Sequence, residues 1–304
     1  MKLKTKNLLT LSDLTKKEFN QLIDFSIKLK KELKKEKTKP LLKNKTLTMI
    51  FQKPSTRTRV SFEVAMFQLG GHAINLSSND MQLSRGESIE DTAKTLSRYT
   101  DCIMARVYDH NLLEKLSEFS AVPVINGLSD TFHPCQILAD FMTIKEKKRK
   151  LKGLKLAWIG DGNNVCNSMI NGCALAEMKM SIATPKGFEP NRRVVNKAQK
   201  FTDIEITTDP SKAIKNADIV VTDTFTSIHN RDPKRTKKFI PKYQVNSNLM
   251  KHAKKNAIFM HCLPAKRGSE VTSSVIDGPQ SVVWDEAENR LHTQKALLVF
   301  LIHA

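Results

Sequence analysis

The chain of 304 residues is 40% hydrophobic and 27% charged, and it contains only 11 glycines and 11 prolines. Those proportions are typical of a globular protein and exclude a collagen-like repeat, a disordered tail and a small disulfide-stapled domain. No apolar run approaches the about 20 residues of a membrane-spanning helix, and no apolar signal core follows the basic N-terminus. We therefore expect a cytoplasmic protein of two domains.

The formal net charge of +19 at pH 7 suggests an anionic partner, either nucleic acid, an anionic membrane surface or a phosphorylated small molecule. The lysines cluster in three separate places, Lys30–Lys39, Lys145–Lys152 and Lys234–Lys238, with no aromatic residues between them. Single-strand binders interleave basic and aromatic side chains. A solvated lysine surface is therefore favoured, and nucleic-acid binding is kept as the lesser alternative.

The five cysteines are scattered along the chain without a C-x-x-C pair. They are Cys102, Cys135, Cys166, Cys173 and Cys262. This spacing favours reduced thiols over a disulfide framework or a zinc site. Most are expected in the core, and Cys262 alone has neighbours that suggest chemistry.

Short apolar runs alternate with helical patterns through the first half of the chain. Apolar spacing predicts a helix over 11–33, with Ser12 and Asp13 as candidate N-cap residues. The elements predicted next are the strand Thr46–Phe51, the helix Arg59–Leu69, the strand Ala73–Leu76, the helix Ser88–Tyr99, the strands Cys102–Arg106 and Val122–Asn126, and the helix Pro134–Lys147. This alternation is typical of a parallel sheet covered on both faces.

The alternation starts again after the basic segment 145–153. The predicted elements are the strand Leu156–Gly160, the helix Asn163–Met178, the strand Ser181–Thr184, the helix Arg192–Phe201, the strand Ile204–Thr207, the helix Pro210–Ala217, the strand Asp218–Asp223, a mostly helical stretch over 241–254 and the strand Ala257–His261. We predict an α/β fold of two doubly wound parallel-sheet domains of similar size. The domains are expected at 1–144, with a helix over 290–304 packing back on it, and at 145–289.

Ligands of such sheets bind at the carboxyl ends of the strands, so we expect the active site in a cleft between the domains. After the first strand, Lys53-Pro54-Ser55-Thr56-Arg57-Thr58-Arg59 combines hydroxyls, guanidinium groups and helix N-terminal amides, which suit a phosphate. It lacks the glycines of a Walker A loop. His133 and Gln136 open a helix and suit a carbonyl oxygen, and Arg106 ends a strand. Each also has a plainer structural explanation as a capping or exposed residue.

Polar residues follow three strands of the second half as well. Gly160-Asp161-Gly162-Asn163-Asn164 lacks the third glycine of a dinucleotide loop, and its two amides suit an amino-acid zwitterion. Asp223 ends a second strand and is followed by Ser227. His261-Cys262-Leu263-Pro264 ends a third strand and places a thiol at the same edge.

Together these motifs extend nearly end to end, from Leu8-Leu9 to the tail 285–292, and on them the chain resembles the transcarbamylases, most closely the ornithine branch. Ser55–Arg59 and His133–Gln136 resemble the carbamoyl-phosphate half of that family. Gln82–Ser88 resembles the loop that reaches into a neighbouring subunit's site. His261-Cys262-Leu263-Pro264 is typical of the ornithine enzymes, since the aspartate enzymes carry a proline in place of Cys262.

The resemblance implies transfer of the carbamoyl group from carbamoyl phosphate to the δ-amine of L-ornithine, giving L-citrulline and phosphate for arginine biosynthesis, with no metal or cofactor. The residues implied for carbamoyl phosphate are Ser55, Thr56, Arg57, Thr58, Gln82, Arg106, His133, Gln136, Cys262, Leu263 and Arg290. Those implied for ornithine are Asn164, Asp223, Ser227 and Ile228.

The catalytic residues implied by the resemblance are Cys262, Asp223, Arg106 and His133. A free alkylamine has a pKa of about 10.4 and must lose a proton before it attacks. Cys262 beside Asp223 is the implied proton acceptor, and a covalent acyl-cysteine is the less favoured alternative.

One stretch departs from the family pattern. The ornithine loop of the family has Ser-Met-Gly followed by acidic residues, whereas this chain has Ser227-Ile228-His229-Asn230 followed by basic ones. Putrescine, acetylornithine and succinylornithine therefore stay as alternative acceptors. The resemblance implies a homotrimer with shared active sites and no nucleic-acid or membrane partner. Larger arrays of trimers and the direction of the reaction, citrulline synthesis or carbamoyl-phosphate recovery, stay open.

Overall fold

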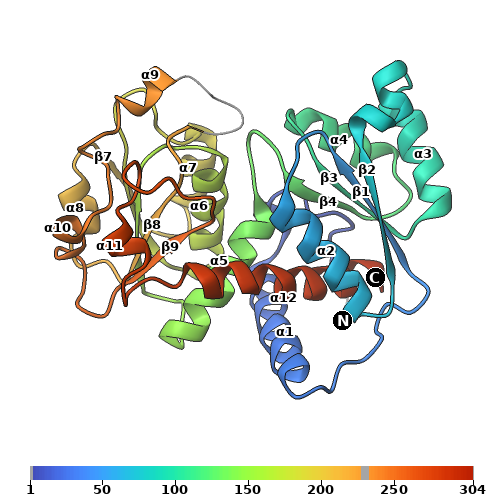
Figure 1. Cartoon of the computed structure of the whole chain (residues 1–304), viewed down its shortest axis with the longest axis horizontal. Coiled ribbons are helices and arrows are strands. Elements are labelled where there is room, and N and C mark those ends of the chain that lie inside the picture. The colour runs from blue at the N-terminus through green and yellow to red at the C-terminus, as the bar shows by residue number, and fades with distance from the viewer. Residues whose placement is uncertain (1–2, 227–232, 304) are drawn as a thin grey trace. The chain divides into compact units, whose positions relative to one another are not determined.

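The computed structural model describes residues 3–226 and 233–303, and the chain divides into two compact units, each with its own parallel sheet (Figure 1). Unit 1 comprises residues 1–142 and 288–304, and unit 2 comprises residues 143–287. The predicted fold class, two α/β domains on parallel sheets, is confirmed. Within these described ranges, no helix has the length and apolar character needed to cross a membrane.

Unit 1 is built on a four-stranded parallel sheet in the order β2-β1-β3-β4. Its strands are β1 (Thr46–Phe51), β2 (His72–Ser77), β3 (Cys102–Arg106) and β4 (Val124–Leu128). Helices α3 (Ile89–Tyr99) and α4 (His110–Phe119) lie beside this sheet (Figure 1), and Ile103 and Ala105 of β3 pack in the cluster that they cover. The alternate residues Cys102 and Met104 are equally buried. Because successive side chains point to opposite faces of a strand, both faces of the sheet are covered.

The other helical elements that contribute to unit 1 are η1 (Leu11–Asp13), α1 (Lys16–Lys34), α2 (Thr56–Gln68), η2 (Ser78–Asp80), η3 (Gln82–Arg85), α5 (Pro134–Lys148) and α12 (Val283–Ile302). The helix α5 continues into unit 2, and α12 begins there.

Unit 2 is built on a five-stranded parallel sheet in the order β7-β6-β5-β8-β9. Its strands are β5 (Lys155–Ile159), β6 (Lys179–Ala183), β7 (Ile204–Thr207), β8 (Ile219–Thr222) and β9 (Ile258–His261). Its helices are α6 (Asn164–Ala176), α7 (Arg192–Ala198), α8 (Pro210–Ile214), α9 (Pro233–Thr236), α10 (Ser247–Met250) and α11 (Ser273–Ile276). Aromatic side chains reinforce the core, where the Phe225 and Phe239 rings stack with centroids 4.6 Å apart.

The strand order places one switch point in each sheet. Successive strands extend from β1 to β2 on one side and through β3 to β4 on the other, and the same reversal separates β5 and β8 in unit 2. Crevices that bind ligands form at the carboxyl ends of strands beside such a reversal. In unit 1 this position follows Phe51 and Arg106, and in unit 2 it follows Ile159 and Thr222.

Several local predictions differ from the structure. Helix α1 is capped by Thr15 and not by Ser12 or Asp13, because the Thr15 hydroxyl and the Glu18 carboxylate exchange hydrogen bonds with each other's backbone amides. Residues 11–13 instead form the short turn η1. Helix α2 begins at Thr56 and not near Arg59, so Arg57 and Thr58 lie in its first turn.

The predicted helix over 241–254 forms only as the short α10. Val245 is extended there, because its amide donates to the carbonyl of Glu270 at 2.9 Å and its carbonyl accepts from the amide of Thr272 at 3.1 Å. These long-range partners override the helical spacing of the apolar residues. Helix α4, which the sequence analysis did not predict, is capped by Asp109.

Candidate active site

In unit 1, the connection from β1 to α2 presents a helix N-terminus suited to an anion. Ser55 is the N-cap residue of α2, yet its hydroxyl makes no capping hydrogen bond, and the first turn holds no acidic residue. Because the amides of a first turn have no partner within the helix and carry partial positive charge, they attract an anion. The exposed Arg57 and the buried Thr58 belong to this same turn.

Lys53 is a residue of this connection that the predicted ligand set omits. Its side chain is buried, and its ammonium group lies 3.8 Å from the centroid of the Tyr108 ring. A cation over an aromatic face is stabilised electrostatically. The sequence contained a signal for Lys53, since a basic residue that directly follows a strand end also lies at the edge where ligands bind.

Three predicted ligands of carbamoyl phosphate meet in a buried network. Arg290 of α12 donates to Oε1 of Gln136 at 2.6 Å and to Oγ1 of Thr58 at 3.3 Å. The amide nitrogen of Gln136 in turn donates to Oδ1 of Asp140 at 2.8 Å. Since both ends of the Gln136 amide are bonded, its orientation is fixed, and α2, α5 and α12 hold Thr58, Gln136 and Arg290 in one place.

His133 lies beside this network in an electropositive environment. Its burial, followed by the guanidinium groups of Arg290, Arg106 and Arg57, lowers the pKa of His133 well below its ordinary value of 6.5. The imidazole is therefore neutral at pH 7 and has one N–H to donate. Three guanidinium groups close enough to act on one imidazole concentrate positive charge where the sequence predicts the phosphate and the carbamoyl oxygen.

The remaining predicted residues of this half lie apart from the cluster. Gln82 is exposed on η3, and none of the side-chain hydrogen bonds among the described residues joins it to Thr58, Gln136 or Arg290. Ser55 and Thr56 line a cavity of about 590 Å³ in unit 1, together with residues of β1 and α2 and of the segment after β2. Arg57 does not line this cavity.

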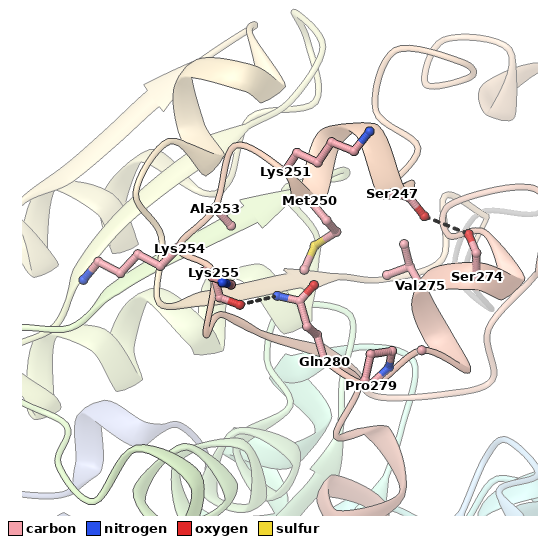
Figure 2. Close-up of a pocket in the computed structure, with 11 residues that line it drawn as sticks. Ser247, Met250, Lys251, Ala253, Lys254, Lys255, Ser274, Val275, Pro279 and Gln280 are labelled. Carbon is pink, nitrogen blue, oxygen red and sulfur yellow. Dashed lines mark hydrogen bonds between the residues drawn. The ribbon is translucent and has the colours of Figure 1, made fainter.

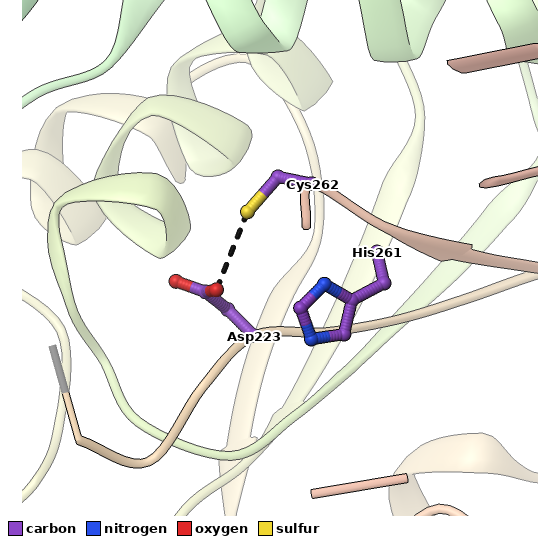
Figure 3. Close-up of side chains that lie close together, drawn as sticks. All are labelled: Asp223, His261 and Cys262. Carbon is purple, nitrogen blue, oxygen red and sulfur yellow. Dashed lines mark hydrogen bonds between the residues drawn. The ribbon is translucent and has the colours of Figure 1, made fainter. Parts of the chain in front are cut away.

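In unit 2, Asp223 is the centre of the candidate acceptor site (Figure 3). Its Oδ1 accepts from the Cys262 thiol at 3.3 Å and from the amide of Thr224 at 2.7 Å, while its Oδ2 accepts from Nδ2 of Asn163 at 2.8 Å. Asn163 also caps α6, where its Oδ1 accepts from the amides of Val165 and Cys166. The predicted ligand Asn164 is buried in the first turn of that helix. Both amides of this turn were expected to suit an amino-acid zwitterion, but only Asn164 was predicted as a ligand, and the bond from Asn163 to Asp223 was not expected.

His261 and Glu270 brace the turn that carries Cys262. His261 is fully buried, its Nδ1 accepts from the amide of Leu263 at 2.9 Å, and its Nε2 lies 3.3 Å from Oε1 of Glu270. An acceptor at Nδ1 places the proton on Nε2, so Nε2 donates to Glu270. Leu263 has a φ of 57°, a conformation that side chains rarely adopt. The buried imidazole thus supports the strained backbone next to Cys262.

The charge on Glu270 is stabilised although the side chain is buried. Burial acts to raise the pKa of Glu270, but hydrogen bonds from His261 and from the amides of Lys266 and Glu270 itself outweigh it, and the net pKa is lowered. His261 and Glu270 were not predicted as supporting residues. Their only signal was the adjacency of His261 to Cys262.

The atoms of Asp223, His261 and Cys262 that could ligate a metal all lie within 4.8 Å of one another. Both ring nitrogens of His261 already have partners, since Nδ1 accepts from Leu263 and Nε2 faces Glu270. A cation would have to displace one of these hydrogen bonds. The donor set therefore fits an acid–base network better than a resident metal.

The other predicted residues of this half are placed as follows. Ser227 and Ile228 lie outside the described residues. A cavity of about 460 Å³ between α10 and α11 contains none of the predicted site residues (Figure 2). Figure 2 shows the Lys251 and Lys254 side chains, which line it, extending to opposite sides. They do not converge on a common ligand position.

Comparisons with known proteins agree with this division into two half-sites. Residues 6–146 match the carbamoyl-P binding domain of the aspartate/ornithine carbamoyltransferases, and residues 152–301 match the Asp/Orn binding domain. An ornithine carbamoyltransferase of Cenarchaeum symbiosum is 61% identical over 99% of this chain and 99% of its own. One of Pyrococcus horikoshii is 52% identical over 99% of this chain and 96% of its own.

Solved structures show the same similarity. The ornithine carbamoyltransferase of Pyrococcus furiosus superposes with a TM-score of 0.94 at 51% identity, covering 98% of this chain and 97% of that one. The enzyme of Thermus thermophilus superposes with a TM-score of 0.90 at 42% identity, covering 98% of this chain and 99% of its own.

Proposed function

The chain belongs to the aspartate/ornithine carbamoyltransferase family, and we propose that it transfers the carbamoyl group of carbamoyl phosphate to the δ-amine of L-ornithine, giving L-citrulline and phosphate in arginine biosynthesis. The observation that carries the choice of acceptor is the hydrogen bond between the Cys262 thiol and the Asp223 carboxylate. A carboxylate at this position attracts the ammonium group of ornithine. The side-chain carboxylate of aspartate would be repelled by it.

Carbamoyl phosphate binds in unit 1 in this proposal. Its phosphate lies at the N-terminus of α2 against Ser55, Thr56, Arg57 and Thr58, with Arg106 alongside. Its carbamoyl oxygen faces His133, Gln136 and Arg290, which hydrogen bonds and burial already hold in place. Donors held before the reaction stabilise the charge that develops on this oxygen when the amine attacks.

The Asp223–Cys262 pair supplies the proton acceptor. The δ-ammonium group first loses a proton to Sγ of Cys262, while the thiol proton passes to Oδ1 of Asp223, which already accepts it in a hydrogen bond. The neutral amine then attacks the carbamoyl carbon and forms the C–N bond. The C–O bond to phosphate breaks with its electron pair on the phosphate oxygen, and the leaving phosphate takes up the second amine proton. In unit 2 the amino-acid end of ornithine is bound by Asn164 and by the predicted Ser227 and Ile228, and Leu263 is assigned as a further ligand of carbamoyl phosphate.

A homotrimer with shared active sites is part of the proposal. Helix α2 exposes two apolar side chains one above the other, Val60 at 51% and Phe67 at 80%, and Ile74 of the edge strand β2 is 38% exposed. Monomers rarely leave such side chains and an open sheet edge uncovered. We assign this face to a second copy of the chain, with the exposed Gln82 entering the neighbouring site. A single species of monomer mass in light scattering would contradict the trimer.

All five cysteines are free thiols, and four of them are buried. Persistent thiols suit a reducing compartment, and we accordingly place the enzyme in the cytoplasm.

Citrulline formation tests the proposed reaction directly. The purified chain is supplied with carbamoyl phosphate and, in separate reactions, with ornithine, putrescine, acetylornithine, succinylornithine or aspartate. We expect the highest kcat/KM with ornithine. A higher value with any other acceptor would overturn the proposed substrate, and no carbamoylated product from any acceptor would overturn the reaction.

A further inference from the structure

Arg235 of α9 is a largely buried arginine of unit 2 that is not among the predicted site residues. Its terminal nitrogen pairs with Oδ2 of Asp161, and the two side chains are only 19% and 10% exposed. Its Nε donates to the carbonyl of Phe225 at 3.3 Å. The guanidinium lies 4.5 Å from the centroid of the Phe188 ring, so an aromatic face also holds it in place.

Asp161 belongs to the turn that follows β5 at the switch point of the sheet. Its carbonyl accepts from the indole of Trp158 at 3.0 Å, and the amide of Gly162 donates to Phe188 at 2.9 Å. A side chain at Gly162 would collide with the backbone of Pro190, which a Cβ would approach to 2.2 Å. The turn is therefore closely packed, and the Arg235–Asp161 ion pair fixes its one charged side chain.

The turn leads directly to the proposed acceptor site. Two residues after Asp161, Asn163 donates to Oδ2 of Asp223, and the opposite oxygen of that carboxylate accepts from Cys262. We propose that Arg235 is a positioning residue for the acceptor amine, because it holds the turn that orients Asp223 and Cys262 and neutralises the second carboxylate beside them. This inference rests on the proposed function for its substrate.

Charge explains why a cation is needed at this point. The charged groups that act on the pKa of Asp161 are Arg235 from α9 and Asp223 after β8. The charge of Asp161 in turn acts to raise the pKa of the Cys166 thiol of α6, after the larger effect of burial. Burial raises the pKa of Asp161 and the charge of Asp223 raises it further, while Arg235 opposes both. Without Arg235, two carboxylates and a thiol would share one buried region with no cation among these groups.

The first test is kinetic and uses the intact chain. In Arg235→Ala we expect the KM for ornithine to rise at least about tenfold, because Asp223 and Cys262 lose their fixed orientation, while the KM for carbamoyl phosphate changes less than about twofold. The acid limb of the pH profile should move to higher pH, because the Asp161–Asp223 pair then retains a proton more readily. Arg235→Lys keeps the positive charge but lacks the planar guanidinium group, so its KM for ornithine should lie between those of the wild type and Arg235→Ala.

Lys237→Ala is the matched control, since Lys237 is exposed, carries a positive charge and lies two residues after Arg235. It should leave both KM values and the pH profile unchanged. Asp161→Asn combined with Arg235→Ala should return the acid limb toward the wild-type position, because the repelling carboxylate is gone. An unchanged ornithine KM and pH profile in folded Arg235→Ala, or an equal effect in Lys237→Ala, overturns the inference.

A second measurement separates this inference from the proposed function. Iodoacetamide alkylates Cys262 without any substrate, and the other four cysteines are buried. Because an uncompensated carboxylate disfavours the thiolate, Arg235→Ala should slow this alkylation at least about threefold. If the wild-type chain makes no citrulline but the alkylation slows as expected, the proposed function fails and the positioning role stands. An unchanged alkylation rate overturns the positioning role.

Discussion

Replacing Arg57 by alanine should separate carbamoyl-phosphate binding from folding. The Arg57 side chain is exposed in the first turn of α2, and it forms no hydrogen bond or ion pair with any residue in the ranges 3–226 and 233–303. A surface change of this kind alters the free energy of unfolding by less than about 0.5 kcal/mol. A charge-assisted contact to phosphate contributes roughly 1.5–3 kcal/mol. We therefore expect ligand affinity to fall about 10- to 150-fold.

The effect is measured by urea unfolding at about 25 °C with and without a phosphonate analogue of carbamoyl phosphate. A ligand present at about 100 times its dissociation constant stabilises the folded wild-type chain by about 2.7 kcal/mol. If the dissociation constant rises about 30-fold in Arg57→Ala, the same ligand concentration stabilises that variant by only about 0.9 kcal/mol. The two unfolding curves without ligand should coincide.

Arg98→Ala is the control in the same unit. Arg98 is exposed in the last turn of α3, and none of the predicted ligand sets includes it. Arg98→Ala should therefore change the free energy of unfolding by less than about 0.5 kcal/mol and keep the full stabilisation by ligand. Arg57→Lys should recover only part of it, because the planar fork is lost. Equal stabilisation of Arg57→Ala and wild type by the ligand would refute the assignment of Arg57 to the phosphate.

Three further outcomes are expected. Burial lowers the pKa of His292 from 6.5 to about 4. The unfolded chain therefore takes up a proton on His292 below about pH 6.5, and the folded chain does so only near pH 4. The stabilising contribution of the neutral His292 is present above about pH 6.5 and is lost as the pH falls toward 4, so the free energy of unfolding should drop by about 2 kcal/mol from pH 7 to pH 5. A folded His292→Gln variant should show a smaller drop in the same urea titrations. Cys262→Ser should retain measurable turnover, since a hydroxyl still donates to Asp223, and mass spectrometry of the wild type with carbamoyl phosphate alone should detect no carbamoyl-enzyme; such an adduct would instead support a covalent role. Mixing Arg57→Ala with Gln82→Ala should regenerate activity if Gln82 serves a neighbouring subunit, and no recovery after demonstrated subunit exchange would argue against that contribution.

Much of the fold was predictable because buried parallel strands are nearly continuous apolar runs. The strand predicted at Cys102–Arg106 is β3 with the same limits, and the one predicted at Ile204–Thr207 is β7. The polar residues directly after these runs were equally visible. Since the carboxyl ends of parallel strands share one edge, Arg106, Asp223 and Cys262 were recognisable as candidates from their position alone.

Residues that act through tertiary contacts were not predictable in this way. Val245 has the spacing of a helical residue, yet backbone partners more than twenty residues away extend it. Glu270 lies nine residues after His261 and follows the polar segment 266–269, which in the sequence suggests an exposed turn. Only the folded chain shows that His261 and Glu270 are both fully buried. Short-range periodicity contains no information about such pairs, because the partner is supplied by another segment.

The net charge of the chain also does not indicate which of its cations belong to the site. The +19 charge was compatible with an anionic partner or with a solvated lysine surface, and the scattered lysines favoured the solvated surface. The informative cations are Lys53, Arg106 and Arg290, each no more than 6% exposed. Burying a cation is costly unless a ligand or partner compensates it, and Arg106 and Arg290 act together on the neutral His133. In the proposed reaction, a phosphate dianion adds to that compensation. Lys30 and Lys295 are buried as deeply, but Lys30 donates to Asn289 and Lys295 to Gln68. Burial beside other predicted ligands, and not the number of charges, therefore indicates the candidate site.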